Sequence, residues 1–196
     1  MKTVNVSLVG VGGQGIILTA DLLAKTAAIA GYDVKKSEIH GMAQRGGSVT
    51  SQVRFGKEVA SPIIQEGTAD ILVSFDKLEA IRNVGILARA GTALVNDLYL
   101  VPVTVSSGLQ QPVTDFETRL SKAFPDALVV DAQKIAEEVG NPKGANVAIL
   151  GSLMEKCNIV SEEKMAEAIR IELGERKAKF LEGNMKAYRA GMEAAK

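Results

Sequence analysis

The sequence predicts an α/β fold: a three-layer, Rossmann-like domain with a mixed, mainly parallel sheet and a helical C-terminal segment. Three observations support this fold class. An apolar stretch near the N-terminus leads through a glycine turn into a helix-forming stretch, strand and helix signals then alternate through most of the chain, and strand signals stop after Pro142. We therefore expect a single domain over residues 1–196, with an α/β core at 1–140 and C-terminal helices at 141–196.

The first unit is a strand, a glycine turn and a helix. The run from Val4 to Val9 is apolar and β-branched, as is typical of a buried parallel strand. Residues 12–15 form the turn. Good helix formers dominate from Ile16 to Ala30, and Gly31 supplies a C-terminal stop signal.

The next stretch predicts two strands and a loop between them. Tyr32 to Ser37 is compatible with a second strand, whereas Ile39 to Gly47 contains three glycines and no periodic apolar pattern, which indicates an exposed loop. Ser48 to Phe55 alternates between small or polar and apolar residues. Gly56-Lys57 resembles a hairpin turn, so an antiparallel strand is expected on each side of it and the sheet should be mixed.

The remaining elements follow from apolar runs and their terminators. The expected strands are Ile71–Phe75, Thr92–Asn96, Leu100–Val105 and Ala127–Val130, and the expected helices are Lys77–Ala88, ended by Gly91, and Ala132–Val139. The C-terminal part predicts helices over Asn146–Lys156, from an N-cap at Ser161, and over Glu175–Met192. These last helices should cover the sheet or contact a partner.

Composition excludes several classes of function. Lysine and arginine number 23 and aspartate and glutamate also 23, so no overall charge favours binding to nucleic acid. No apolar run approaches the length of about 20 residues that spans a bilayer, and no secretion signal precedes the first strand, so we expect a cytoplasmic protein. Cys157 and His40 are the only residues of their types, which excludes a disulfide, a cysteine-ligated cluster or a multi-histidine metal site made by this chain alone.

The glycine turn is the first candidate site. Its residues Gly10, Gly12, Gly13, Gln14 and Gly15 fit the dinucleotide pattern G-x-G-x-x-G between a strand and a helix. That pattern requires an acidic residue about 20 positions later, at the end of the second strand, but Asp33 lies at the start of that strand. A tight turn that packs closely or contacts a neighbouring subunit is therefore favoured over NAD binding, and a phosphate of another ligand remains an alternative.

The loop over residues 37–47 is the second candidate site. It contains His40, Gln44 and Arg45 among paired glycines, and such loops often carry function because they contribute little to a core. The planar guanidinium of Arg45 is suited to a carboxylate or phosphate. A structural role is favoured for His40, and the alternative for the whole loop is a solvated surface turn.

Both candidate sites resemble those of a known family. Gly-Val-Gly-Gly-Gln-Gly at 10–15, the loop at 37–47 and Val-Arg-Phe-Gly at 53–56 look like the gamma-type domain of 2-oxoacid:ferredoxin oxidoreductases. The His-Gly-Met-Ala-Gln-Arg-Gly-Gly version of the loop, at 40–47, resembles the beta subunit of the indolepyruvate enzymes, and the ending at 184–191 is also similar. The resemblance therefore spans nearly the whole chain.

The resemblance implies a supporting role in a larger enzyme. That enzyme oxidatively decarboxylates an aryl 2-oxoacid to its acyl-coenzyme A, with thiamine diphosphate, magnesium and iron-sulfur clusters on a larger catalytic subunit, and electrons pass to ferredoxin. This chain would then be a non-catalytic subunit that binds no cofactor alone. The alternatives are the same role with pyruvate, 2-oxoglutarate or a branched-chain oxoacid, or a stand-alone nucleotide-binding regulatory module.

Overall fold

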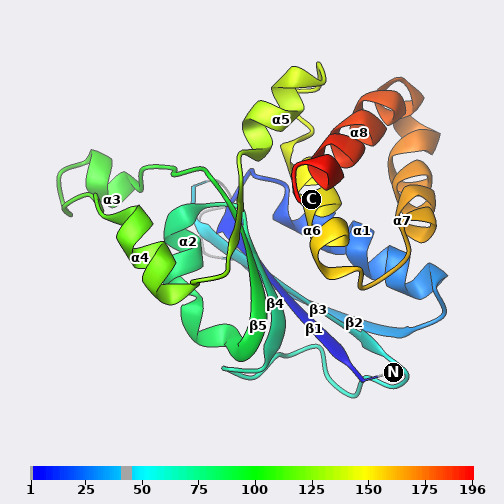
Figure 1. The fold of residues 1–196 in the computed structure, drawn as a ribbon, viewed down its shortest axis with the longest axis horizontal. Coiled ribbons are helices and arrows are strands. Elements are labelled where there is room, and N and C mark those ends of the chain that lie inside the picture. Colours follow the sequence, from blue (N-terminus) through cyan, green and yellow to red (C-terminus); the bar gives the residue numbers. More distant parts are fainter. Residues whose placement is uncertain (1, 41–45) are drawn as a thin grey trace.

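The computed structural model describes residues 2–40 and 46–196, and for His40 and residues 173–179 it describes the backbone alone (Figure 1). The strands are β1 (Val4–Val11), β2 (Asp33–His40), β3 (Ser48–Gly56), β4 (Ala69–Ser74), β5 (Leu87–Asn96) and β6 (Leu128–Val130). The helices are α1 (Ile16–Ile29), α2 (Lys77–Arg82), α3 (Val103–Ser106), α4 (Phe116–Ala123), α5 (Ala132–Glu138), α6 (Ala145–Cys157), α7 (Glu162–Ile169) and α8 (Glu175–Glu193), with the short 3₁₀ segment η1 (Val84–Ile86) and the π-helical segment η2 (Arg170–Gly174).

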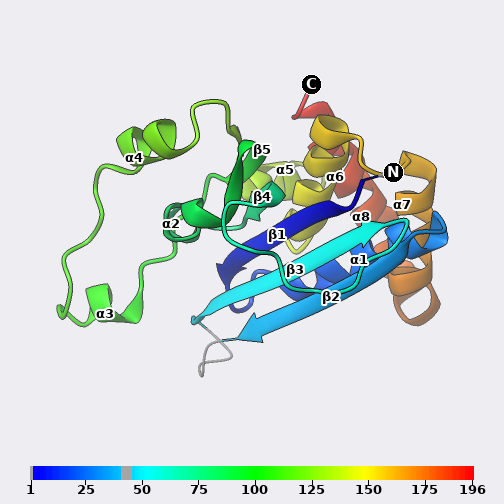
Figure 2. The same ribbon diagram turned by 90° about the horizontal axis from the view of Figure 1, so that it is seen from below.

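The strands form one six-stranded sheet in the order β2-β3-β1-β4-β5-β6 (Figure 2). Parallel pairs join β1 to β4, β4 to β5 and β5 to β6, whereas β3 is antiparallel to both of its neighbours, β1 and β2. Strand β3 therefore runs against all the others. This confirms the predicted mixed, mainly parallel sheet.

Alternate side chains of the strands supply two apolar layers, one on each face of the sheet. Leu8 of β1 and Leu94 of β5 point into a large core beneath α1, α6, α7 and α8, while their neighbours Val9 and Val95 pack beneath α2 and α4. Because helices cover both faces, the three-layer architecture expected from the sequence is confirmed.

The expected strand after Gly56 is wrong. Both edges of β3 are already paired, with β2 and β1, so no edge is left for a hairpin partner. The chain after Gly56 instead runs over one face of the sheet, where Arg54 donates hydrogen bonds to the carbonyl oxygens of Ser61 and Ile63 at 2.7 and 3.0 Å. The hairpin is formed by β2 and β3, and residues 41–47 connect them.

Two other predicted elements differ from the structure, one in length and one in type. The helix expected over Lys77–Ala88 ends at Arg82, and Gly91 lies inside β5 instead of ending that helix. The strand expected over Leu100–Val105 is the short helix α3, because Pro102 immediately before it has no N–H for a sheet ladder. Helix α4 was not expected at all.

Helices α6 and α8 cross with their backbones in contact. A Cβ atom placed on Gly151 would lie 2.0 Å from the carbonyl oxygen of Tyr188, and one on Gly191 would lie 2.0 Å from that of Ala148. The hydroxyl of Ser152 donates a hydrogen bond to the carbonyl oxygen of Gly191 at 2.8 Å across the same crossing. Two glycines therefore set how closely the C-terminal helix approaches the core.

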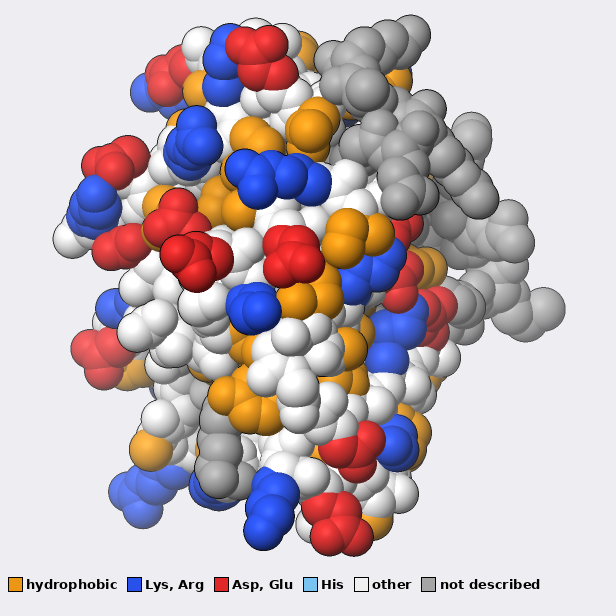
Figure 3. All heavy atoms as spheres, turned by 90° about the vertical axis from the view of Figure 1, so that its right-hand side faces the viewer, with side chains coloured by type: hydrophobic (Ala, Val, Ile, Leu, Met, Phe, Trp, Pro, Cys, Tyr) orange, Lys and Arg blue, Asp and Glu red, His pale blue; other side chains and the backbone are white. Residues whose placement is uncertain are grey.

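The surface mixes charges of both signs. On the face that includes α7 and α8, acidic and basic side chains lie among scattered apolar ones (Figure 3). Within the part of the chain that the structure describes, no helix combines the length and apolarity needed to cross a membrane.

Candidate functional site

The glycine turn lies directly after β1, at the carboxyl edge of the parallel strands. Gly13 and Gly15 have φ angles of 107° and 84°, which residues with a Cβ atom rarely adopt. A Cβ atom on Gly10 would lie 2.7 Å from Oε1 of Gln14 and 2.8 Å from Cβ of Phe75. Glycine is therefore required at these positions by backbone conformation or by close packing.

Gln14 uses its side chain to hold the turn in place. Its Oε1 accepts a hydrogen bond from the amide of Val11 at 2.7 Å, and its Nε2 donates to the carbonyl oxygen of Phe75 at 3.1 Å. Since Phe75 follows β4, this side chain ties the end of β1 to the end of β4. Gln14 is thus a structural clamp of the turn, whatever ligand the turn binds.

The structure brings the two sequence-predicted sites together. The amide of Gly12 donates to the carbonyl oxygen of Gly47 at 2.8 Å, and the amide of Gly46 donates to that of Gly12 at 3.4 Å. The β2–β3 connection is therefore anchored against the glycine turn. Gln44 and Arg45 lie outside the described residues, and so does the side chain of His40, whose backbone is in register with Val49.

The topology differs from that of a dinucleotide-binding unit. There, the strand beside β1 runs parallel to it and ends in the acidic residue that binds the ribose. Here the neighbour is the antiparallel β3, and Asp33 begins β2 at the opposite end from the turn. Hydrogen bonds from Lys35 and from the Val59 amide hold the pKa of Asp33 below its usual value, so this carboxylate stabilises the local chain.

Two buried carboxylates near the turn were not assigned any chemistry from the sequence. Asp76 accepts hydrogen bonds from the amides of Leu78 and Leu100 at 2.8 and 2.7 Å, and burial raises its pKa. Glu79 is 1% exposed and accepts hydrogen bonds from Arg82 at 2.7 Å and from the Ser48 hydroxyl at 2.6 Å. Asp76 is the N-cap residue of α2.

These groups line a cavity of about 260 Å³ between the two candidate sites and α2. Val11, Gly12, Gly46 and Ser48 form one side, and the α2 residues face the apolar segment 100–103. That segment belongs to an arm that projects from the sheet (Figure 2) and exposes Val101, Val103 and Leu109 by 55%, 72% and 79%. Sequence periodicity did not reveal this cavity because its walls come from four separate parts of the chain.

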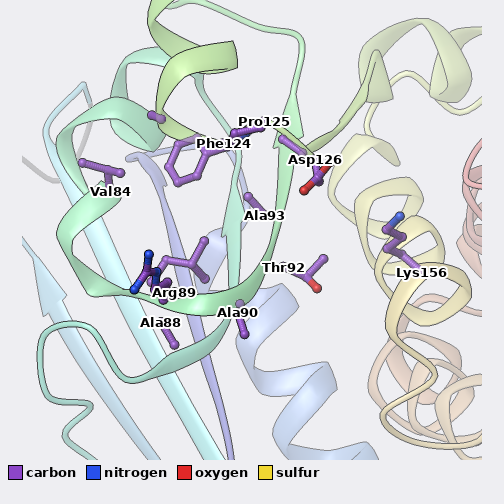
Figure 4. A pocket seen from close by; sticks show the side chains of 14 residues that line it. Val84, Ala88, Arg89, Ala90, Thr92, Ala93, Phe124, Pro125, Asp126 and Lys156 are labelled. Carbon is purple, nitrogen blue, oxygen red and sulfur yellow. The ribbon is translucent and has the colours of Figure 1, made fainter.

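A roomier cavity, about 540 Å³, lies at the other edge of the sheet, beside the beginning of β5 (Figure 4). Apolar side chains such as Phe124 and Ala93 form its wall, and Arg89, Asp126 and Lys156 stand around it. Ligands of open α/β sheets bind at the carboxyl ends of the strands, and this cavity is at the opposite end. We therefore place the candidate site at the glycine turn.

Metal binding finds no support in the part of the chain that the structure describes. Among the described residues, no group of three or more His, Cys, Asp or Glu side chains is placed to hold a metal ion. The single thiol, Cys157, ends α6, and burial raises its pKa to about 11. A four-cysteine iron-sulfur cluster does not fit a chain with one cysteine.

Known proteins resemble the chain over its full length. The family model described as pyruvate ferredoxin/flavodoxin oxidoreductase matches residues 5–194. Indolepyruvate oxidoreductase subunit IorB of Thermococcus kodakarensis is 40% identical over 200 residues, which cover 100% of this chain and 98% of that protein.

Solved structures share the fold. The pyruvate oxidoreductase subunit PORC of Thermotoga maritima superposes with a TM-score of 0.73 at 26% identity. The superposition covers 98% of this chain and 97% of the Thermotoga chain. In the 2-oxoglutarate:ferredoxin oxidoreductase of Magnetococcus marinus the fold recurs with a TM-score of 0.75 at 21% identity, and this chain covers 31% of that longer one. The chain therefore belongs to the pyruvate ferredoxin/flavodoxin oxidoreductase family and is a small subunit of a 2-oxoacid:ferredoxin oxidoreductase, with the indolepyruvate type among its near relatives.

Proposed function

We propose that this chain docks on a larger catalytic subunit through its carboxyl edge and orders the channel for an aryl 2-oxoacid or coenzyme A. The main support is the pair of backbone hydrogen bonds between Gly12 and residues 46–47. These bonds join the glycine turn to the last residues of the loop whose sequence contains Gln44 and Arg45. Thiamine diphosphate, magnesium and the iron-sulfur clusters would be held by the partner. The isolated chain is then inactive.

Within this role, Arg45 and Gln44 contact the partner or its substrate. An arginine beside a carboxylate or a phosphate forms two parallel hydrogen bonds, which suits both an oxoacid and coenzyme A. In the glycine turn, the backbone amides of Val11, Gly12 and Gln14 already donate hydrogen bonds within the chain. The turn would therefore present the amides of Gly13 and Gly15 to the partner or to a phosphate of coenzyme A.

Replacing Arg45 in the assembled enzyme tests this role. Arg45→Ala is co-expressed with the larger subunit, and the matched control is Arg89→Ala, at the opposite edge of the sheet. We expect Arg45→Ala to raise the KM for the oxoacid or for coenzyme A at least about tenfold, or to weaken assembly measured by size-exclusion chromatography, while the control does neither. Unchanged kinetics together with intact assembly would remove the loop from the mechanism.

The exposed apolar arm supplies a second test of docking at the same edge. Val103→Glu introduces a charge on the arm, at a residue that is 72% exposed in this chain. The control is Val84→Glu on η1, a residue that is 41% exposed and lines the cavity of about 540 Å³ at the opposite edge of the sheet. We expect the first variant to assemble poorly with the larger subunit and the second to assemble normally, because a buried, unpaired charge opposes association. Equal assembly would exclude the arm from the interface.

The substrate is tested separately with the assembled enzyme. Indolepyruvate, pyruvate, 2-oxoglutarate and a branched-chain 2-oxoacid are compared by kcat/KM with ferredoxin as acceptor. The highest value is expected for the aryl oxoacid, since the similarity to the indolepyruvate subunit covers the whole chain. A preference for any other substrate would leave the docking role intact and change only the type of enzyme.

A further inference from the structure

The cavity of about 260 Å³ beside the glycine turn has mostly apolar walls. They come from Val11 at the end of β1, Leu78 in α2 and residues 100–103 of the arm. The volume of about 260 Å³ is below the roughly 300–1,000 Å³ that is typical of pockets for small-molecule ligands. A space of this size at the surface of a subunit instead suits one large side chain of a partner.

The two carboxylates at this cavity already have hydrogen-bond partners. Oδ1 of Asp76 accepts from two amides of α2, and Oδ2 accepts from the amide of Leu100. Glu79 accepts from Arg82 with one carboxylate oxygen and from the Ser48 hydroxyl with the other. A new hydrogen-bond donor would have to compete with these partners for the two carboxylates, so an apolar occupant is favoured.

The guanidinium of Arg82 adds a preference for an aromatic group. Arg82 lines the cavity with a side chain that is 49% exposed, and its Nη1 donates to Oε1 of Glu79 at 2.7 Å. Because Glu79 is 1% exposed, this ion pair fixes a planar cation at the cavity wall. A guanidinium stacks on the face of an aromatic ring, which an aliphatic side chain does not offer. Apolar walls and a fixed guanidinium together match one aromatic ring.

The arm side of the cavity is held in place within the free chain. The amide of Leu100 donates to Asp76 at 2.7 Å, so the first cavity residue of the arm is tied to α2. Lys77 forms ion pairs with Asp97, which precedes the arm, and with Glu117, which follows it. A wall that is ordered before binding lowers the entropy cost of association.

We propose that this cavity receives one aromatic side chain of the larger catalytic subunit. The ring packs between Leu78 and residues 100–103, with one face against Arg82. Aromatic side chains inserted into a pocket often dominate the binding energy of an interface. The choice of partner rests on the proposed function: the cavity lies between the glycine turn and the exposed arm, at the edge through which this chain docks. The anchor does not involve Arg45.

Binding of small probes to the full 196-residue chain tests the cavity directly. N-acetyl-tryptophanamide, N-acetyl-leucinamide and indolepyruvate are titrated separately, and the methyl signals of Leu78, Leu100 and Val101 are followed by NMR. We expect saturable shifts with the aromatic amide, at an affinity at least about twofold higher than that of the aliphatic amide. Absent shifts or equal affinities for the two amides would overturn the inference. Tighter binding of indolepyruvate than of the aromatic amide would also overturn it, because the cavity would then be a site for an aryl oxoacid.

Replacement of Arg82 tests the stacking on the ring. Glu79→Gln alone is compared with Glu79→Gln combined with Arg82→Met, so that neither protein buries an unpaired carboxylate. Removal of the guanidinium should lower the affinity for N-acetyl-tryptophanamide by about two- to fivefold and leave that for N-acetyl-leucinamide unchanged. An equal effect on both amides, or an effect on neither, would overturn the choice of an aromatic group.

Assembly with the larger subunit tests the source of the ring. Val101→Ala removes part of the cavity wall at a residue that is 55% exposed in the free chain, so the fold is preserved. The matched control is Ile63→Ala, at a residue that is 51% exposed and is not part of the cavity wall. Isothermal titration calorimetry should show the Kd for the larger subunit rising at least about tenfold for Val101→Ala and less than about twofold for Ile63→Ala. Equal values for the two variants would overturn the inference.

The outcomes separate the anchor from the docking role. Weaker assembly of Val103→Glu together with normal assembly of Val101→Ala would leave the docking role intact and overturn the anchor. Normal assembly of both variants and of Arg45→Ala, with unchanged kinetics of Arg45→Ala, would overturn the docking role as well. Saturable binding of N-acetyl-tryptophanamide would then show an aromatic cavity that the larger subunit does not fill.

Discussion

The side chain of Gln14 donates a hydrogen bond to the carbonyl oxygen of Phe75 at 3.1 Å and accepts one from the Val11 amide at 2.7 Å. These two contacts join the ends of β1 and β4, and the cavity of about 260 Å³ opens beside them. The glycine turn is thus held by a side chain from within it. A residue that the sequence places among ligand-binding candidates therefore determines the shape of the candidate site.

Gln14→Ala should destabilise the chain by about 1–3 kcal/mol. The main cost is the Val11 amide, which loses its acceptor, whereas the Phe75 carbonyl keeps the hydrogen bond from Asn96 at 3.2 Å. Urea unfolding measures the difference, with Gln111→Ala at an exposed position as the control. A value equal to that of the control would show that this side chain does not hold the turn.

The sequence was sufficient for the elements whose signals are local. The first strand, the glycine turn and α1 follow from an apolar run, clustered glycines and helix formers, and the structure has them within two residues of the expected limits. Strand pairing is not local, and so the turn signal at Gly56-Lys57 predicts a hairpin there, although β3 pairs with β2, to which residues 41–47 connect it. No local pattern shows that both edges of β3 are occupied.

The candidate site was predictable only in part. Glycines at 10–15 and the paired glycines at 46–47 are visible in the sequence, but only the structure shows that hydrogen bonds join them at one edge of the sheet. Asp76 and Glu79 lie near the end of a strand, where carboxylates more often cap helices or face solvent, yet both are 1% exposed here.

Gly191→Ala should destabilise the chain by about 3 kcal/mol or more. The new methyl group would lie 2.0 Å from the Ala148 carbonyl oxygen, so α8 must move away from α6. Gly183→Ala is a matched control in the same helix, because its Cβ atom would make only ordinary contacts at 3.5 Å with Asn141. There a gain of up to about 1 kcal/mol is expected from helix propensity. Equal urea midpoints for the two variants would contradict the close crossing.

Asp76 should make the stability of the chain depend on pH. Burial raises its pKa in the folded chain above the ordinary 3.8, so the folded state binds the proton more tightly than the unfolded state. Its contribution to stability is therefore greatest below pH 3.8 and falls as the pH rises through the raised pKa. Asp76→Asn does not titrate. The unfolding free energy of wild type minus that of the variant should decrease as the pH rises from about 3.5 to 7, and an increase would contradict the direction of the shift.

Cys157 should react slowly with alkylating reagents while the chain is folded. Burial raises its pKa from 9.0 to about 11, so the thiolate fraction at neutral pH is lower by about 100-fold than in an ordinary thiol. Because the chain has one cysteine, iodoacetamide labelling followed by mass spectrometry reports this site alone. The rate should rise at least about tenfold in urea, and in the folded chain it should still be increasing at about pH 10, where the unfolded chain has levelled off. Equal rates in the two states would mean that the end of α6 does not shield the thiol from water.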